Sequence, residues 1–298
     1  MQTTLARLRE KGIPTVESCL LSEHSSFRIG GAARVAIFPE TRNQLLESLG
    51  ILREYKQRFL LIGNASNVVF SDEGFDGFVI FTSRWKALSV QGEQMTVVAG
   101  TPLTTVAKTA LEHSLGGAEF TYGIPGTAGG AVFMNAGAFG GCMEQICVSS
   151  EYYDIHTGEI VTLRGDAQQF GTRTSFYETH PEAVILGAVL QLQHGDAEEI
   201  RGRMSDFLQR RKNTQPLEYP SAGSVFKRPA GHFAGKLIED CGLKGLTVGG
   251  AQVSEKHAGF IVNRGGATAE DVKRLVEQIK ETVLRRTGVT LECEIRFL

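Results

Sequence analysis

The clearest pattern of apolar and polar positions lies at the C-terminal end of the chain. Apolar residues recur at helical spacing over positions 272–283, and Thr268 with Asp271 resembles a capping box at the start of a helix. Gly288 is expected to end this helix. Residues 289–297 then alternate between apolar and polar, which predicts a strand with one buried face that carries Glu294 on its polar side.

Helical and strand patterns alternate through the rest of the chain. Helices are expected to begin after Thr41, after Thr101 with Pro102 as the first helical residue, and near Asp196. The second of these is expected to end at Gly116. Short apolar runs predict strands at 59–62, 78–81, 95–99, 131–134, 146–155 and 184–193. The sequence therefore indicates a mixed fold with strands and helices throughout.

The pattern divides the chain into three parts. Residues 1–84 resemble a small α/β unit, residues 85–195 an α+β unit with antiparallel strands, and residues 196–298 a third unit. A chain of 298 residues is long enough for about two domains of ordinary size. No internal repeat and no low-complexity linker interrupts it.

Composition and charge narrow the function classes. Hydrophobic residues make up 42% and charged residues 21%, which is typical of a globular enzyme. The net charge of −2 comes without a basic block, which argues against nucleic acid as a partner. No apolar stretch approaches the ~20 residues of a membrane span, and the N-terminus lacks the apolar core of a secretory signal.

The five cysteines are widely spaced and odd in number, which argues against a disulfide framework. Cys142 and Cys147 lie five residues apart, but no second Cys or His pair completes a zinc pattern, and no metal site is expected. We expect reduced, mostly buried thiols and a cytoplasmic location.

Glycine is the exception in the composition: 35 of the 298 residues are glycine, which is well above the usual share of about 7%. One small-residue segment, Gly63-Asn64-Ala65-Ser66-Asn67, follows a predicted strand directly. Successive backbone N–H groups in such a turn can converge on an anion. The segment matches neither a G-x-G-x-x-G fingerprint nor a P-loop, and an ordinary strand-to-turn connection is the alternative.

A longer glycine-rich run spans 123–138, beginning Gly-Ile-Pro-Gly-Thr-Ala-Gly-Gly and ending Asn-Ala-Gly-Ala. This glycine density would destabilise a helix interior. Small residues let a backbone approach phosphates and an aromatic ring closely. The run therefore indicates a closely bound, extended ligand, and a tight turn system between strands is the alternative.

Three further residues carry possible chemistry, although none is decisive alone. Ser224 lies in a turn, Ser-Ala-Gly-Ser-Val-Phe-Lys, and a serine donates a proton only when its surroundings stabilise the alkoxide. Arg173 by itself is an ordinary surface arginine, and Glu294 an ordinary solvated carboxylate. The seven histidines show no triad or metal spacing, and none is assigned a catalytic role.

The order of these motifs resembles one family. Phe27-Arg28-Ile29-Gly30-Gly31, the 63–67 turn, the 123–138 run, the 221–227 turn and Glu292-x-Glu294 occur in the order seen in the UDP-N-acetylenolpyruvylglucosamine reductase (MurB) family. The resemblance covers nearly the whole chain. It implies an α+β fold with a two-part FAD-binding domain of the vanillyl-alcohol-oxidase (PCMH) type, at 1–84 and 85–195. A substrate domain is implied at 196–298, with the final strand returning Glu294 to the active site.

The resemblance also implies a reaction and its residues. NADPH reduces FAD, hydride passes to C3 of the enolpyruvyl group of UDP-GlcNAc-enolpyruvate, and Ser224 protonates C2 to give UDP-N-acetylmuramate, a peptidoglycan precursor. Arg173 matches the arginine that stabilises the substrate carboxylate, and Glu294 matches the catalytic glutamate. The implied FAD-binding residues are Gly63, Asn64, Ala65, Ser66, Asn67, Gly123, Ile124, Pro125, Gly126, Thr127, Gly129, Gly130, Asn135, Ala136 and Gly137.

The chain departs from the family pattern at three places. Arg228 stands where the family often has asparagine, and Cys293 stands where it usually has proline. The segment between Ser175 and Val184 leaves no room for the tyrosine loop of one branch, so the chain resembles the shorter, second type. Another FAD-dependent oxidoreductase of the same fold is the alternative, and a non-catalytic nucleotide-binding module is a second one.

Overall fold

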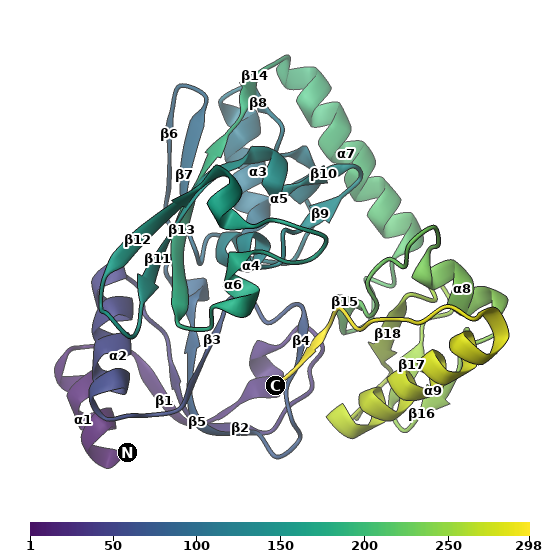
Figure 1. Cartoon of the computed structure of the whole chain (residues 1–298), viewed down its shortest axis with the longest axis horizontal. Coiled ribbons are helices and arrows are strands. Elements are labelled where there is room, and N and C mark those ends of the chain that lie inside the picture. Colours follow the sequence, from purple (N-terminus) through teal and green to yellow (C-terminus); the bar gives the residue numbers. More distant parts are fainter. The chain divides into compact units, whose positions relative to one another are not determined.

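The computed structural model describes all 298 residues, and contacts between them divide the chain into two compact units. Unit 1 comprises Met1–Glu17, Val35–Asn64 and Gly77–Arg210, and unit 2 comprises Ser18–Arg34, Ala65–Asp76 and Arg211–Leu298. Figure 1 shows the elements in chain order, from purple at the N-terminus to yellow at the C-terminus. The three-part division expected from the sequence, 1–84, 85–195 and 196–298, stays a prediction.

A four-stranded sheet belongs largely to unit 1, in the order β1-β2-β5-β3, with β3 parallel to β5. The N-terminal ends of β2 and β5, and the C-terminal end of β1, are assigned to unit 2. The side chain of Thr41 accepts a hydrogen bond from the N–H of Gln44 at 3.2 Å, so the predicted cap of α2 is confirmed. The elements are α1 (Gln2–Glu10), β1 (Thr15–Leu20), η1 (Leu21–His24), β2 (Ala32–Ile37), α2 (Arg42–Glu54), β3 (Phe59–Ile62), β5 (Phe75–Phe81) and η2 (Thr82–Arg84).

An antiparallel five-stranded sheet forms the second layer of unit 1, in the order β12-β11-β13-β7-β6. Its strands are β6 (Leu88–Gln91), β7 (Gln94–Val98), β11 (Cys147–Asp154), β12 (Ile160–Arg164) and β13 (Ala183–Gln191). Aliphatic and aromatic side chains of this sheet pack with α3 (Leu103–Glu112) and α4 (Ala128–Phe133) in one buried core. The predicted strands at 95–99, 146–155 and 184–193 are confirmed to within two residues.

Short elements complete unit 1 around this core. They are β8 (Leu115–Gly116), η3 (Glu119–Thr121), β9 (Gly137–Ala138), β10 (Gly141–Cys142), α5 (Met143–Ile146), η4 (Gly165–Gln168), α6 (Phe176–Thr179) and β14 (Gln193–His194). A long helix, α7 (Ala197–Thr214), follows, and the chain passes into unit 2 at Arg211 within it. The carboxylate of Asp196 accepts hydrogen bonds from the N–H groups of Glu198 and Glu199, so the start expected near Asp196 is confirmed.

Unit 2 is built on an antiparallel sheet in the order β15-β18-β17-β16, which packs with α9 in one buried core. Thr268 and Asp271 form the predicted capping box of α9, and Gly288 ends that helix with φ +72°. The elements are β4 (Val68–Val69), β15 (Ser221–Ser224), α8 (Ala234–Asp240), β16 (Thr247–Val248), β17 (Ala251–Val253), β18 (Phe260–Asn263), α9 (Ala269–Thr287) and β19 (Arg296–Phe297).

Two strand predictions are wrong. Residues 131–134 belong mostly to α4, because Thr127 caps a short helix there and accepts a hydrogen bond from the N–H of Gly130 at 3.4 Å. The glycine-rich run is therefore partly helical, against expectation. Of the predicted strand 289–297, only β19 (Arg296–Phe297) is regular, and it pairs in parallel with β4. The residues before it keep the alternation of burial, since Leu291 and Ile295 are buried, but they lack a continuous partner strand.

The predicted ends of the helix at 103–112 are also wrong. Pro102 is the N-cap of α3, because the hydroxyl of Thr101 instead donates to the carbonyl of Ala87 at 2.8 Å. The helix ends at Glu112, and Ser114 takes a left-handed conformation two residues later. Gly116 lies beyond this turn, in β8.

Candidate functional site

The two glycine-rich segments meet within unit 1. Gly63 follows β3 directly, and a Cβ atom at this position would overlap the hydroxyl oxygen of Thr127. Asn64 donates a side-chain hydrogen bond to the carbonyl of Pro125 at 2.7 Å. The first loop is therefore closed against the N-terminal cap of α4, and only glycine fits at the point of contact.

The backbone of the 63–67 loop has the form of an anion nest. Ala65 is buried and has φ +46° in the left-handed region. The N–H groups of Asn64, Ala65 and Ser66 make no hydrogen bond within the chain. Consecutive N–H groups that converge at a left-handed residue form a concavity for anionic oxygens. The loop therefore offers three backbone N–H groups that have no acceptor within the chain.

The 123–138 run is held close to the five-stranded sheet. A Cβ atom on Gly129 would lie 2.8 Å from the Cβ of Ala99, so glycine lets α4 approach the end of β7. Asn135 follows α4 and is buried with φ +41°. Its amide nitrogen donates to the carbonyl of Gly171 at 2.9 Å, and its amide oxygen accepts from the N–H of Glu144 at 2.9 Å. The run is thus held at Gly129 and at Asn135.

Arg173 lies in a tight turn that contacts this run. Gly171 and Thr174 form a bridge in which the N–H of Gly171 donates to Thr174 at 3.0 Å. Arg173 sits at the end of this turn with φ +58°, a conformation that L-residues adopt rarely. Its guanidinium donates to the carbonyl of Gly137 at 3.1 Å. Unit 1 therefore brings Arg173 together with Asn135 and Gly137.

Ser224 and Glu294 are neighbours within unit 2. Ser224 ends β15 and is exposed, whereas Glu294 is half-buried. The N–H of Glu294 donates to the carbonyl of Val225 at 2.7 Å, and the N–H of Lys227 donates to the carbonyl of Glu292 at 2.9 Å. The turn that carries Ser224 and the segment that carries Glu294 therefore run side by side.

The other motifs of unit 2 converge on the same place. Asn67 donates a side-chain hydrogen bond to the carbonyl of Glu294 at 3.2 Å. The hydroxyl of Ser26 donates to the carbonyl of Ser221 at 2.8 Å and contacts that of Ala65 at 3.3 Å. Four segments that are distant in sequence, at 26–31, 65–67, 221–227 and 292–294, thus form one cluster.

One residue of this cluster was missed in the sequence. Asn263 is buried at the end of β18, and its amide nitrogen donates to the carbonyl of Phe27 at 3.1 Å. Its amide oxygen accepts from the N–H groups of Gly265 at 2.9 Å and Ala267 at 3.2 Å. The available signal was a polar residue that ends an otherwise apolar strand and lies two residues before a pair of glycines.

The cysteine beside Glu294 is a packing residue. Burial raises the pKa of the Cys293 thiol to about 11, so it stays protonated at neutral pH. Burial also raises the pKa of the Cys147 thiol, in unit 1, to about 12. All five cysteines are free, and three of them are buried.

Arg228, which stands where the family often has asparagine, is exposed and follows Ser224 by four residues. Its guanidinium lies over the ring of Phe233, 4.0 Å from the centroid, and its Nε donates to the carbonyl of His232 at 3.3 Å.

The short segment after Ser175 forms α6, whose Tyr177 is buried with its hydroxyl donating to Ser150 at 2.7 Å. No tyrosine-bearing lid extends from it. No helix is long and apolar enough to cross a membrane.

Two family models and a group of named relatives match the chain. Residues 33–164 match the model of a FAD binding domain, and residues 215–298 match the C-terminal domain of UDP-N-acetylenolpyruvoylglucosamine reductase. A reductase of that name from Caldanaerobacter subterraneus subsp. tengcongensis is 44% identical over 278 residues, which cover 93% of this chain and 91% of the relative.

Solved structures confirm the fold class. The UDP-N-acetylenolpyruvylglucosamine reductase (MurB) of Thermus caldophilus has a TM-score of 0.80 and 34% identity, over 96% of this chain and 98% of that one. An alkyldihydroxyacetonephosphate synthase, at 15% identity and a TM-score of 0.50, shares the fold over 65% of this chain and 40% of its own. An α+β fold with a FAD-binding domain of the vanillyl-alcohol-oxidase type is therefore correct.

These findings decide the class of protein. The matched FAD-binding model spans residues 33–164 and therefore includes both the 63–67 loop and the 123–138 run. FAD is the cofactor, with NADPH as the reductant in this family. The chain belongs to the UDP-N-acetylenolpyruvoylglucosamine reductase family of FAD-dependent oxidoreductases.

Proposed function

We propose that the chain reduces the enolpyruvyl group of UDP-GlcNAc-enolpyruvate with NADPH, giving UDP-N-acetylmuramate for peptidoglycan synthesis. The observation that carries the proposal is the pairing of the Ser224 turn with the Glu294 segment by the 2.7 Å hydrogen bond from the N–H of Glu294 to Val225. A proton donor and a carboxylate are thereby held on adjacent backbone in a member of a reductase family. UDP-GlcNAc-enolpyruvate and NADPH are the small-molecule partners in this proposal.

The residues proposed to hold FAD are those of the two loops. Their shared property is a backbone with small side chains, which lets N–H groups approach phosphate oxygens. They are Gly63, Asn64, Ala65, Ser66, Asn67, Gly123, Ile124, Pro125, Gly126, Thr127, Gly129, Gly130, Asn135, Ala136 and Gly137. When bound, FAD supplies the hydride that C3 of the substrate receives. Residues 1–84 and 85–195 are proposed as the two FAD-binding subdomains, and residues 196–298 as the substrate domain.

Arg173 is proposed to bind the carboxylate of the enolpyruvyl group. Hydride addition at C3 builds negative charge on C2 and on that carboxylate. A guanidinium already fixed by its hydrogen bond to Gly137 stabilises this charge more in the transition state than in the ground state. Preorganisation is needed because a mobile arginine would first have to be ordered.

Ser224 is proposed to donate the proton that C2 receives. A C–H bond forms at C2 as the O–H bond of Ser224 breaks, and the double bond of the substrate becomes the single bond of the lactyl ether. The exposure of Ser224 leaves its hydroxyl accessible to a substrate. Glu294 is assigned the acid–base support of this transfer, since an isolated serine is a weak acid.

The compartment is part of the same proposal. Five free cysteines accord with a reducing environment, and a nucleotide-sugar substrate with NADPH points to the cytoplasm.

The experiment that tests the function uses the purified chain without added cofactor. We expect a flavin spectrum, bleaching by NADPH under anaerobic conditions, and recovery of the oxidised spectrum when UDP-GlcNAc-enolpyruvate is added. Bleaching without recovery would assign the chain to a different FAD-dependent reaction.

A further inference from the structure

A strained aromatic residue forms the tip of the hairpin β9–β10. Phe139 and Gly140 connect the two strands, and both have positive φ, +54° and +89°. A two-residue turn with both central residues in this region strongly prefers Asn-Gly, because a bulky L-residue is strained there. Phenylalanine at this position indicates that the ring itself has a role.

The ring of Phe139 stacks on a helix. Its centroid lies 4.6 Å from that of Phe207 in α7, and the two planes differ by 10°. Phe139 remains 39% exposed, so burial of apolar surface alone does not explain its position. The stack holds the tip of the hairpin against one face of α7.

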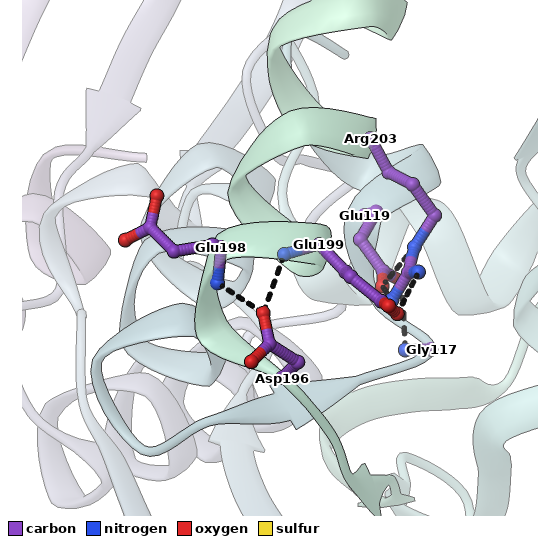
Figure 2. A network of polar contacts seen from close by, with 6 residues as sticks. All are labelled: Gly117, Glu119, Asp196, Glu198, Glu199 and Arg203. Atoms are coloured by element: carbon purple, nitrogen blue, oxygen red, sulfur yellow. Dashed lines mark hydrogen bonds and ion pairs between the residues drawn. The ribbon is translucent and has the colours of Figure 1, made fainter.

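The same face of α7 makes a second contact one turn earlier. Arg203 precedes Phe207 by four residues, and its guanidinium donates two hydrogen bonds to one oxygen of Glu119, at 2.7 and 2.9 Å (Figure 2). The other oxygen of Glu119 accepts from the N–H of Gly117 at 2.7 Å. The buried carboxylate of Glu119 therefore fixes η3 to α7.

The element η3 in turn contacts the base of the hairpin. Phe120 follows Glu119, and a Cβ atom on Gly141 would lie 2.6 Å from Cδ1 of Phe120. Gly141 pairs with Ala138 across the hairpin, and the adjacent pair joins Cys142 to Gly137. The hairpin is thus held at its tip by Phe207 and at its base by η3.

The hairpin also contacts Arg173, since the carbonyl of Gly137 in β9 accepts a hydrogen bond from its guanidinium at 3.1 Å. We propose that the Phe139–Phe207 stack positions Arg173 for the reductive step through the hairpin β9–β10. Phe139 and Phe207 are positioning residues and contact neither substrate nor cofactor in this role. The inference rests on the proposed function of Arg173.

The test compares Phe139→Gly, Phe207→Ala and Phe207→Tyr with the wild-type holoenzyme by anaerobic stopped-flow absorbance. Phe139→Gly removes the ring and also relieves the strained backbone. Phe207→Tyr keeps a ring that can stack. Arg201→Ala is the matched control, since Arg201 lies on α7 with an exposed side chain and pairs only with Glu198.

We expect Phe139→Gly and Phe207→Ala to slow flavin reoxidation by UDP-GlcNAc-enolpyruvate by roughly 10- to 100-fold, the range for a small misplacement of a catalytic group. Bleaching by NADPH, the FAD content and the midpoint of thermal unfolding of the Phe139→Gly protein are expected to stay near wild type. Phe207→Tyr is expected to restore the rate, and Arg201→Ala to leave it unchanged.

The possible failures are distinguishable. A wild-type protein that is not reoxidised by the substrate contradicts the proposed function itself. If the wild type is reoxidised and both ring-deleted variants react at the same rate, the positioning role is wrong. If they lose rate only in proportion to FAD content or thermal stability, the stack is structural and the inference is overturned.

Discussion

Removal of the carboxylate of Glu119 is predicted to destabilise unit 1 without abolishing its fold. In the wild type this carboxylate accepts three hydrogen bonds, two from Arg203 and one from the N–H of Gly117. Its side chain is 9% exposed, whereas that of Arg203 is 46% exposed. In Glu119→Ala, water can therefore hydrate the guanidinium of Arg203. The N–H of Gly117 loses its acceptor, and the removed side chain leaves a cavity, so part of the stability is lost.

The magnitude follows from that asymmetry. Losing one partner of a fully buried ion pair costs about 3–5 kcal/mol. Exposed pairs contribute only about 0–1 kcal/mol. Arg203 is half-exposed, so the loss of its ion pair lies between these two limits. The N–H of Gly117 left without its acceptor costs about 1–3 kcal/mol, and together these place the loss in the free energy of unfolding near 2 kcal/mol. For a chain of 298 residues, with an unfolding entropy of about 2.1 cal/mol/K per residue, such a loss lowers the melting temperature by roughly 3 °C.

Differential scanning calorimetry of the FAD-free protein at low and high salt measures this loss. Glu198→Ala is the matched control, because its side chain is 77% exposed and pairs only with Arg201, so a change below about 0.5 kcal/mol is expected. Glu119→Gln keeps the shape and one of the two acceptor oxygens, and should lose about half as much. Equal stability of Glu119→Ala and Glu198→Ala would refute the reasoning.

Three further predictions concern other parts of the chain. Gly63→Val is expected to weaken FAD binding by at least about tenfold, because its side chain would displace Thr127 from the cap of α4, and titration of the apoprotein with FAD by fluorescence measures this. Burial lowers the pKa of His257, whose Nδ1 accepts a hydrogen bond from the N–H of Gly259, so the folded state binds a proton less readily than the unfolded state. Stability is therefore expected to be lost as pH falls below the ordinary histidine pKa of about 6.5, and His257→Gln should flatten that dependence in thermal unfolding at pH 5 to 8. An equal loss of stability with falling pH in both proteins would argue against this role of His257. Thr268→Ala is expected to cost about 1 kcal/mol through loss of the capping box of α9, read from urea unfolding, whereas no change would show that the Asp271 contacts suffice.

Local patterns predicted those elements whose signals are local. The start of α2 at Thr41, the start of α7 at Asp196 and the capping box of α9 depend on side chains next to the helix ends. The strand Phe59–Ile62 is apolar and bounded by turn residues. Such signals require no knowledge of distant segments, so the sequence alone suffices.

The errors have tertiary causes. The glycines at 129 and 130 were interpreted against a helix, but Thr127 caps one there and Gly129 packs against Ala99, a contact invisible in the sequence. The alternating run at 289–297 predicted a full strand, yet its partners are the irregular Ser224 turn and the two-residue β4. Helix and strand propensity is overridden where close packing decides the backbone.

The candidate site was predictable as a set of motifs and only partly as an arrangement. Ser224, Glu294 and Arg173 were selected through family resemblance, and each had an ordinary explanation as a turn or surface residue. The structure adds the hydrogen bonds that join them to their surroundings, from Glu294 to Val225 and from Arg173 to Gly137. Asn263 and the Phe139–Phe207 stack join residues far apart in sequence, so no local pattern announces them.

The central claim is that Ser224 delivers the proton that completes reduction of the enolpyruvyl group. The most direct measurement compares wild type and Ser224→Ala after anaerobic reduction by NADPH, following the oxidised flavin absorbance when UDP-GlcNAc-enolpyruvate is added. The account predicts equal reduction by NADPH in both proteins and reoxidation of Ser224→Ala slower by at least about 100-fold, the lower range for a general acid. Reoxidation of Ser224→Ala at the wild-type rate, or an equal loss in both half-reactions, would contradict it.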